Sequence, residues 1–95
     1  MPITVPRNGD VKQTVAAATL ILIEPSDLVK IVWIRCSAAF EVVVDPSLSD
    51  GDALPANRGW PVAAGEAWPQ AVVPGFKILV SVPTGAGTLS CIGEQ

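Results

Sequence analysis

Histidine and tyrosine are both absent from this sequence of 95 residues. Histidine is the commonest general base and the commonest metal ligand in proteins, so its absence excludes Ser-His-Asp and Cys-His arrangements. Long apolar runs are missing too: the longest, residues 15–23, falls well short of the roughly twenty residues that cross a bilayer. We therefore expect neither an enzyme nor a transmembrane protein.

Positive charge is also scarce. Lys and Arg number 6 against 9 Asp and Glu, which gives a net charge of −3. Nucleic acids and anionic membranes both need a basic protein surface, so neither is expected as a partner. Residues 1–10 contain Pro, Gly and Asp where a secretory signal would be basic and then apolar, so we expect synthesis in a cytoplasm.

Cysteine occurs only twice, at Cys36 and Cys91, with neither a CxxC pair nor a zinc spacing. No metal site and no cofactor are expected. Both cysteines lie in apolar segments, where a free thiol behaves as a small hydrophobic group, and this favours two buried thiols. A disulfide stays open as the alternative, although a cytosolic origin disfavours it.

Hydrophobic residues make up 49% of the sequence and charged residues 16%, so the chain is expected to fold. Short β-branched runs recur between Pro, Gly and Asp clusters, and no segment sustains a helical period. The pattern predicts an all-β protein: a single small antiparallel β-sandwich or jelly-roll-like domain of about seven or eight short strands over residues 11–95. An extended N-terminal arm is expected over residues 1–10.

Within the domain, residues 28–36 are predicted to form a buried central strand, with Trp33 in the core. Residues 40–44 are expected to pair with it as a hairpin through a tight connection at Ser37 and Ala38. Residues 45–59 form the longest loop, a length at which loops are usually functional or mobile. The prolines that follow predict edge strands or bends.

Acidic side chains are the only numerous candidates for catalysis, and a glycosidase-like pair would have to come from them. The acids considered are Glu41, Asp45, Asp50, Asp52 and Glu66. Turn formation and solubility explain them better. The loop lacks the ligand spacing and closing Glu of an EF-hand, and the turn at residues 83–87 lacks the Lys-Ser/Thr of a phosphate loop. No catalytic residue is assigned.

Trp60 and Trp68 lie in Gly- and Pro-rich surroundings after the long loop. Tryptophan is common both in small cores and at interface anchors, and both roles stay open for these two residues. A carbohydrate-binding platform would also expose tryptophan, but such platforms usually add tyrosine.

The order of segments resembles that of small β-sandwich virion proteins of tailed bacteriophages, of the head decoration or cement type. The resemblance rests on the strand and turn at residues 20–27, the strands at 29–35 and 40–44, and the segments at 54–61, 64–68 and 84–89. It is a likeness of layout over residues 15–92.

The resemblance implies a structural protein of the capsid surface that binds the major capsid protein shell as a homotrimer and stabilises the phage head. Ile3 and Val5 of the arm would add a strand to the capsid. Leu54, Trp60 and Trp68 beside the long loop are the other candidate contacts with capsid or subunit. The alternatives are another virion component, such as a head-fibre, tail-tip or receptor-recognising spike domain, and a carbohydrate-binding module.

Overall fold

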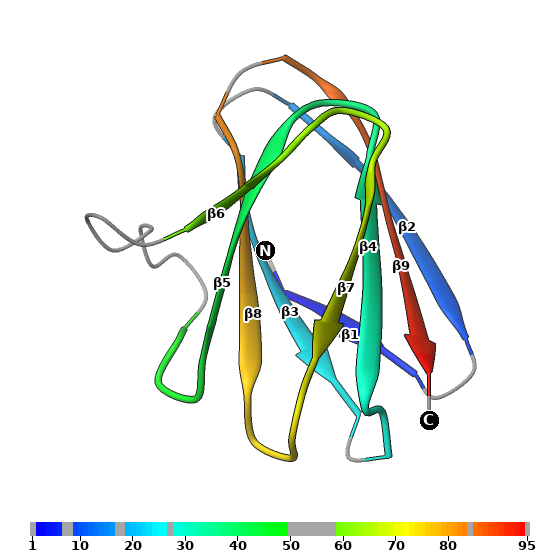
Figure 1. Ribbon diagram of the computed structural model, residues 1–95, viewed down its shortest axis with the longest axis vertical. Helices are drawn as coiled ribbons and strands as arrows, with labels where there is room; N and C mark the ends of the chain where they lie inside the picture. The colour runs from blue at the N-terminus through cyan, green and yellow to red at the C-terminus, as the bar shows by residue number, and fades with distance from the viewer. Residues whose placement is uncertain are drawn as a thin grey trace.

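The computed structural model describes residues 2–6, 9–16, 19–26, 28–49, 59–83 and 85–94. In these ranges the chain forms nine strands and no helix, arranged as two facing sheets (Figure 1). The strands are β1 (Pro2–Val5), β2 (Asp10–Val15), β3 (Thr19–Pro25), β4 (Ile31–Cys36), β5 (Phe40–Asp45), β6 (Trp60–Val62), β7 (Ala67–Ala71), β8 (Lys77–Val82) and β9 (Gly87–Glu94). The expected all-β sandwich is confirmed.

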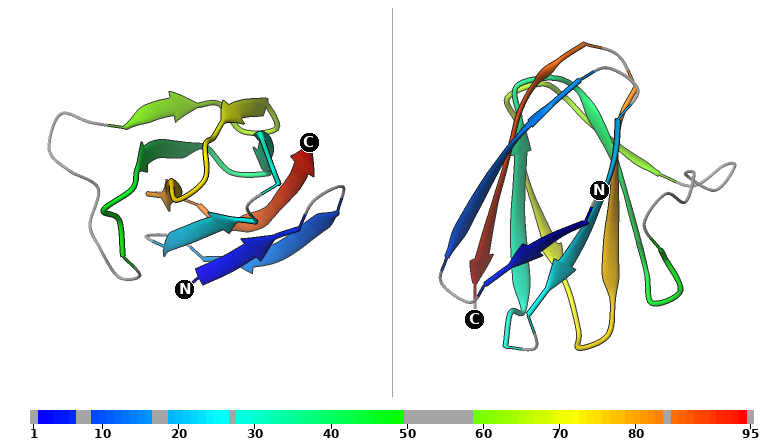
Figure 2. Two further views of the ribbon diagram at one scale, coloured as in Figure 1. Left: turned by 90° about the horizontal axis from the view of Figure 1, so that it is seen from below. Right: turned by 180° about the vertical axis from the view of Figure 1, so that it is seen from behind.

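One sheet has the order β1-β3-β8-β5-β6 and the other β2-β9-β4-β7. Strands β2 and β9, β3 and β8, β4 and β7, and β5 and β6 pair antiparallel, as in one long hairpin whose tip lies between β5 and β6. The hairpin is wound so that β9 also pairs with β4, and β8 with β5 (Figure 2). This winding is the topology of a jelly roll.

The N-terminal segment does not extend as an arm. Strand β1 pairs in parallel with β3, and Ile3 and Val5 are only 7% and 0% exposed. Their burial depends on a close approach to β9, where a Cβ on Gly93 would lie 2.4 Å from the Pro6 carbonyl oxygen. The alternating apolar pair fills the end of the core, so it is not available for a capsid contact.

Strands β4 and β5 do not form the expected hairpin, because they belong to different sheets. Every second side chain from Val32 to Phe40 is buried, including Ala38 in the connection. The chain thus keeps one side toward the interior while it crosses from one sheet to the other. A hairpin would have kept both strands in one sheet.

The interior between the sheets is filled by alternate side chains from all nine strands. Cys36 and Cys91 lie in this core as free thiols, as their apolar surroundings predicted. Burial raises the pKa of the Cys91 thiol to about 12, and the neighbouring Cys36 adds to the shift. Cys91 is therefore a protonated, unreactive thiol at neutral pH.

Candidate functional site

The two tryptophans expected beside the long loop meet at one corner of the sandwich. Their ring centroids are 5.7 Å apart, and the planes are tilted by 34°. Trp68 is partly buried against the core, whereas Trp60 is 61% exposed. The Trp68 indole N–H donates to the Gln70 side-chain oxygen at 3.1 Å. Trp68 thus acts as a core plug, and Trp60 presents an aromatic surface to solvent.

This Trp60–Trp68 corner lies between β6 and β7, which are edge strands of the two sheets. Pro61 and Pro69 lie in these edges, as the prolines predicted. Proline cannot donate a main-chain hydrogen bond, so neither edge offers a full ladder to an incoming strand. A partner at this corner would be held by side chains.

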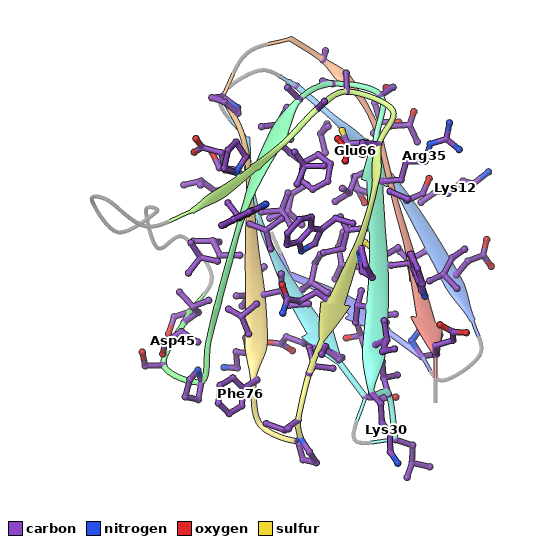
Figure 3. All side chains as sticks on the ribbon, viewed as in Figure 1. Lys12, Lys30, Arg35, Asp45, Glu66 and Phe76 are labelled. Atoms are coloured by element: carbon purple, nitrogen blue, oxygen red, sulfur yellow. The ribbon has the colours of Figure 1, made fainter. Side chains whose placement is uncertain are left out.

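The other sequence candidates do not converge on a catalytic arrangement. Leu54, Asp50 and Asp52 lie outside the described residues. Asp45 ends β5, where its Oδ1 accepts hydrogen bonds from the Ser47 amide and hydroxyl at 2.8 and 2.6 Å. Glu66 lies in the turn before β7, at the opposite end of the molecule from Asp45 (Figure 3). Asp45 is thus a turn-forming residue, as the sequence favoured.

The outer face of the five-stranded sheet carries an apolar row. Leu22, Leu79 and Val43 are direct neighbours across β3, β8 and β5, and all three are buried although they point away from the interior. Leu48, which follows β5, packs on this row, and Leu20 extends it. We term this surface the closed face. Its covering explains why the centres of β3 and β8 are apolar on both sides.

The outer face of the four-stranded sheet is exposed, and we term it the open face. Trp33, expected in the core, points outward here and is 38% exposed, because Val32 and Ile34 take the inward positions of β4. Its indole N–H donates to Glu94 Oε2, which restrains the ring. Ile92, directly opposite Trp33, is 49% exposed.

The open face is not among the sites expected from the sequence. The signal was the strand alternation itself: Arg35 lies two residues from Trp33, and Glu94 lies two residues from Ile92. Positions two apart in a strand share a face, so each charged residue marks its neighbour as outward-pointing.

Two basic side chains stand on the open face. Lys12 of β2 and Arg35 of β4 both lie directly opposite Ser90 of β9, so the three residues form one row across the sheet. Both cations extend into solvent on the same side of the molecule (Figure 3). Neighbouring strands are about 4.8 Å apart, so the two backbones are separated by roughly 10 Å, which two long side chains can span.

The row borders an open depression of about 560 Å³, which we term the basic trough. Its lining is Lys12, Arg35, Ser37, Ala64, Gly65, Thr88 and Ser90. A second depression of about 410 Å³ shares Lys12, Arg35 and Ser90 and continues over Trp33 and Ile92. At the rim, Gly65 has a φ of 79°, a conformation that favours glycine, and its N–H donates to the Cys36 carbonyl at 2.8 Å.

Within the described ranges, no group of three or more His, Cys, Asp or Glu side chains is placed to hold a metal ion. The same residues include no helix that is long and apolar enough to cross a bilayer. Compared with known proteins, the chain matches no family model, no curated protein and no solved structure.

Proposed function

We propose that this protein is a structural component of a tailed-phage virion, a decoration or cement protein that binds the major capsid protein shell and stabilises the head. The observation that carries the proposal is the Trp60–Trp68 corner, an exposed indole supported by a partly buried one. Tryptophan that is exposed on a rigid support is typical of the anchors that dominate protein interfaces.

The architecture is compatible with this role. Jelly rolls recur in viral capsid proteins, although a fold alone does not assign a function. The action would be mechanical, because apolar area buried against the shell opposes its expansion.

The corner also suits a trimer. Three copies around a local three-fold axis of the capsid would each present one Trp60 to an equivalent capsid subunit. The closed symmetry would then bury all three Trp60 side chains. Ile3 and Val5 take no part, since they belong to the core. The capsid contact is therefore assigned to Trp60, with Trp68 supporting it.

The test is reconstitution on phage heads that have been stripped of the protein. Purified chain is added back, the heads are sedimented, and bound copies are counted by quantitative mass spectrometry. We expect wild-type protein to bind and to raise the temperature at which heads release their DNA. Trp60→Ala is expected to bind roughly a hundredfold more weakly, which is a typical cost for a central interface tryptophan.

The matched control is Trp33→Ala, which removes the same side chain from the open face and is expected to leave head binding unchanged. Light scattering on the purified protein, without phage heads, gives its oligomeric state, and we expect a trimer. The proposal fails if purified heads contain none of the protein, or if both tryptophan variants bind like the wild type.

A further inference from the structure

The basic trough holds two cations, Lys12 and Arg35, on either side of Ser90. Within the described part of the chain, neither Lys12 nor Arg35 makes an ion pair, although acids outnumber bases in the sequence. Asp10 lies one row further along β2, opposite Ile92, and Glu94 accepts the Trp33 N–H. Glu66, in the turn before β7, also makes no ion pair in these ranges. Two cations on either side of one serine form a place for an anionic group.

Hydroxyl groups lie between the cations and on one side of them. Ser90 stands between them, and Thr88 and Ser37 lie beyond it in the trough. The Thr88 amide donates to Ser37 Oγ at 2.9 Å, which fixes the position of that oxygen and leaves its proton free to donate. The ligand would therefore meet charged donors in one row and hydroxyl groups in the next.

An apolar surface lies on the other side of the cations. The second depression runs from the shared basic row over Trp33 and Ile92. The bond to Glu94 restrains the Trp33 ring. The open face thus changes along the strands from hydroxyl groups to cations and then to an aromatic platform.

The position of the trough decides between kinds of ligand. β9 and β4 are central strands whose main chains are paired on both sides, so a peptide cannot bind there by adding a strand. Recognition must come from side chains. The two depressions are each of the size of small-molecule sites.

We infer that the basic trough binds a carboxylated sugar unit of an acidic glycan. Arg35 and Lys12 receive the carboxylate, Ser90 and Thr88 exchange hydrogen bonds with ring hydroxyl groups, and Trp33 packs against the apolar C–H side of a sugar. Asp10 and Glu94 repel the carboxylate from the opposite end of the face and so orient the ligand. The inference does not depend on the capsid role, since Trp60 is not part of this site.

The experiment is calorimetric titration of the full chain with sialyllactose, trigalacturonate and a hyaluronan tetrasaccharide, each at low and at physiological salt. Lactose is the neutral counterpart of sialyllactose, and a short poly-glutamate peptide and inorganic phosphate supply charge without a sugar. We expect at least one acidic saccharide to bind at least roughly tenfold more tightly than lactose, the peptide or phosphate, with affinity falling as salt rises. Amide NMR shifts are expected in β2, β4 and β9.

Variants locate the site. Arg35→Ala is expected to weaken binding roughly tenfold or more and Trp33→Ala by a similar factor, because each removes a main contact of the sugar. Lys30→Ala is the matched control: it removes one exposed positive charge at the opposite end of the molecule (Figure 3) and is expected to bind like the wild type. Melting temperatures near that of the wild type show that the variants fold.

Three results overturn the inference. Binding of none of the three acidic saccharides at ten-millimolar concentration excludes the ligand class. Equal binding of lactose, poly-glutamate or phosphate shows that the trough recognises sugar or charge alone. Unchanged affinity of the Arg35→Ala variant shows that the saccharide binds elsewhere.

Discussion

The closed and open faces are the outer surfaces of two sheets that share one core, but only the closed face is covered by the chain itself. On the closed face, Leu22 and Leu79 are apolar and are covered by Leu48 of the same chain. On the open face, Trp33 and Ile92 are apolar and remain exposed beside two cations that form no ion pair within the described ranges. The first surface contributes to the stability of the fold, and the second is available to a partner.

The difference lies in what borders each apolar row. The apolar row of the closed face belongs to one cluster that the chain completes with its own Leu48. The open face alternates apolar, basic and hydroxyl rows, so a purely apolar cover would bury Lys12 and Arg35 without partners, which is costly. A cover that carries negative charge would offset both cations.

The largest loss of stability is expected from a truncation within the closed face. Leu79→Ala removes a fully buried side chain from the centre of its apolar row and is expected to lower the free energy of unfolding by about 3 kcal/mol. Trp33→Ala, a larger truncation on the open face, is expected to cost less than about 1 kcal/mol. Urea denaturation of both variants measures the contrast, and equal losses would contradict the distinction between the faces.

The next prediction makes the closed face resemble the open one. Leu48→Ala removes the side chain that packs on Leu22, Val43 and Leu79 and is expected to cost about 2 kcal/mol. The uncovered leucines should bind a hydrophobic dye such as ANS, whereas wild-type protein should bind it weakly. Arg35→Ala serves as the control that leaves the cover in place. If Leu48→Ala has wild-type stability and dye binding, Leu48 does not close this face.

A third prediction compares the two sides of one strand. Cys91 points into the core, while Ser90 beside it points into the trough. A thiol reagent at mild alkaline pH is expected to label the native wild-type chain slowly and to label one added site rapidly in Ser90→Cys. Rapid labelling of the wild type before unfolding would show that the interior opens.

The Cys91 pKa also gives this core position a pH signature. The thiol ionises at about 9.0 in the unfolded chain and at about 12 when folded, so above pH 9 the folded state holds more protons. The contribution of Cys91 is fully present below about pH 9 and is lost as pH rises toward 12. The free energy of unfolding should fall by about 1 kcal/mol between about pH 9 and about pH 10. This fall should be smaller in Cys91→Ala, and an equal fall would assign it to other groups.

Local chemistry was enough to predict much of the sandwich. β-Branched runs bounded by Pro, Gly and Asp predicted strands, and Pro61 and Pro69 marked edges. The alternation in β5 placed Glu41 opposite Phe40, as observed. Each of these features depends on a residue and its near neighbours in sequence, which is why it can be derived without knowing the partners of a strand.

The errors concern partners that are distant in sequence. Ile3 and Val5 are typical of any short strand, and only the space left beside β3 and Gly93 makes them part of the core. In sequence, the connection at Ala38 is indistinguishable from a hairpin turn. Only the fold shows that Ala38 faces the core while the chain crosses from one sheet to the other. Trp33 was expected in the core because it lies in the middle of an apolar run, but the alternation set by Arg35 was the better guide.

The smallest change in stability is expected when a cation is removed from the open face. Removing either cation, as Lys12→Ala or Arg35→Ala, is expected to change the free energy of unfolding by no more than about 0.5 kcal/mol, because neither makes an ion pair in the described ranges. Thermal melting of both variants measures it. A large loss on either substitution would instead make the basic row a structural element and align the open face with the closed one.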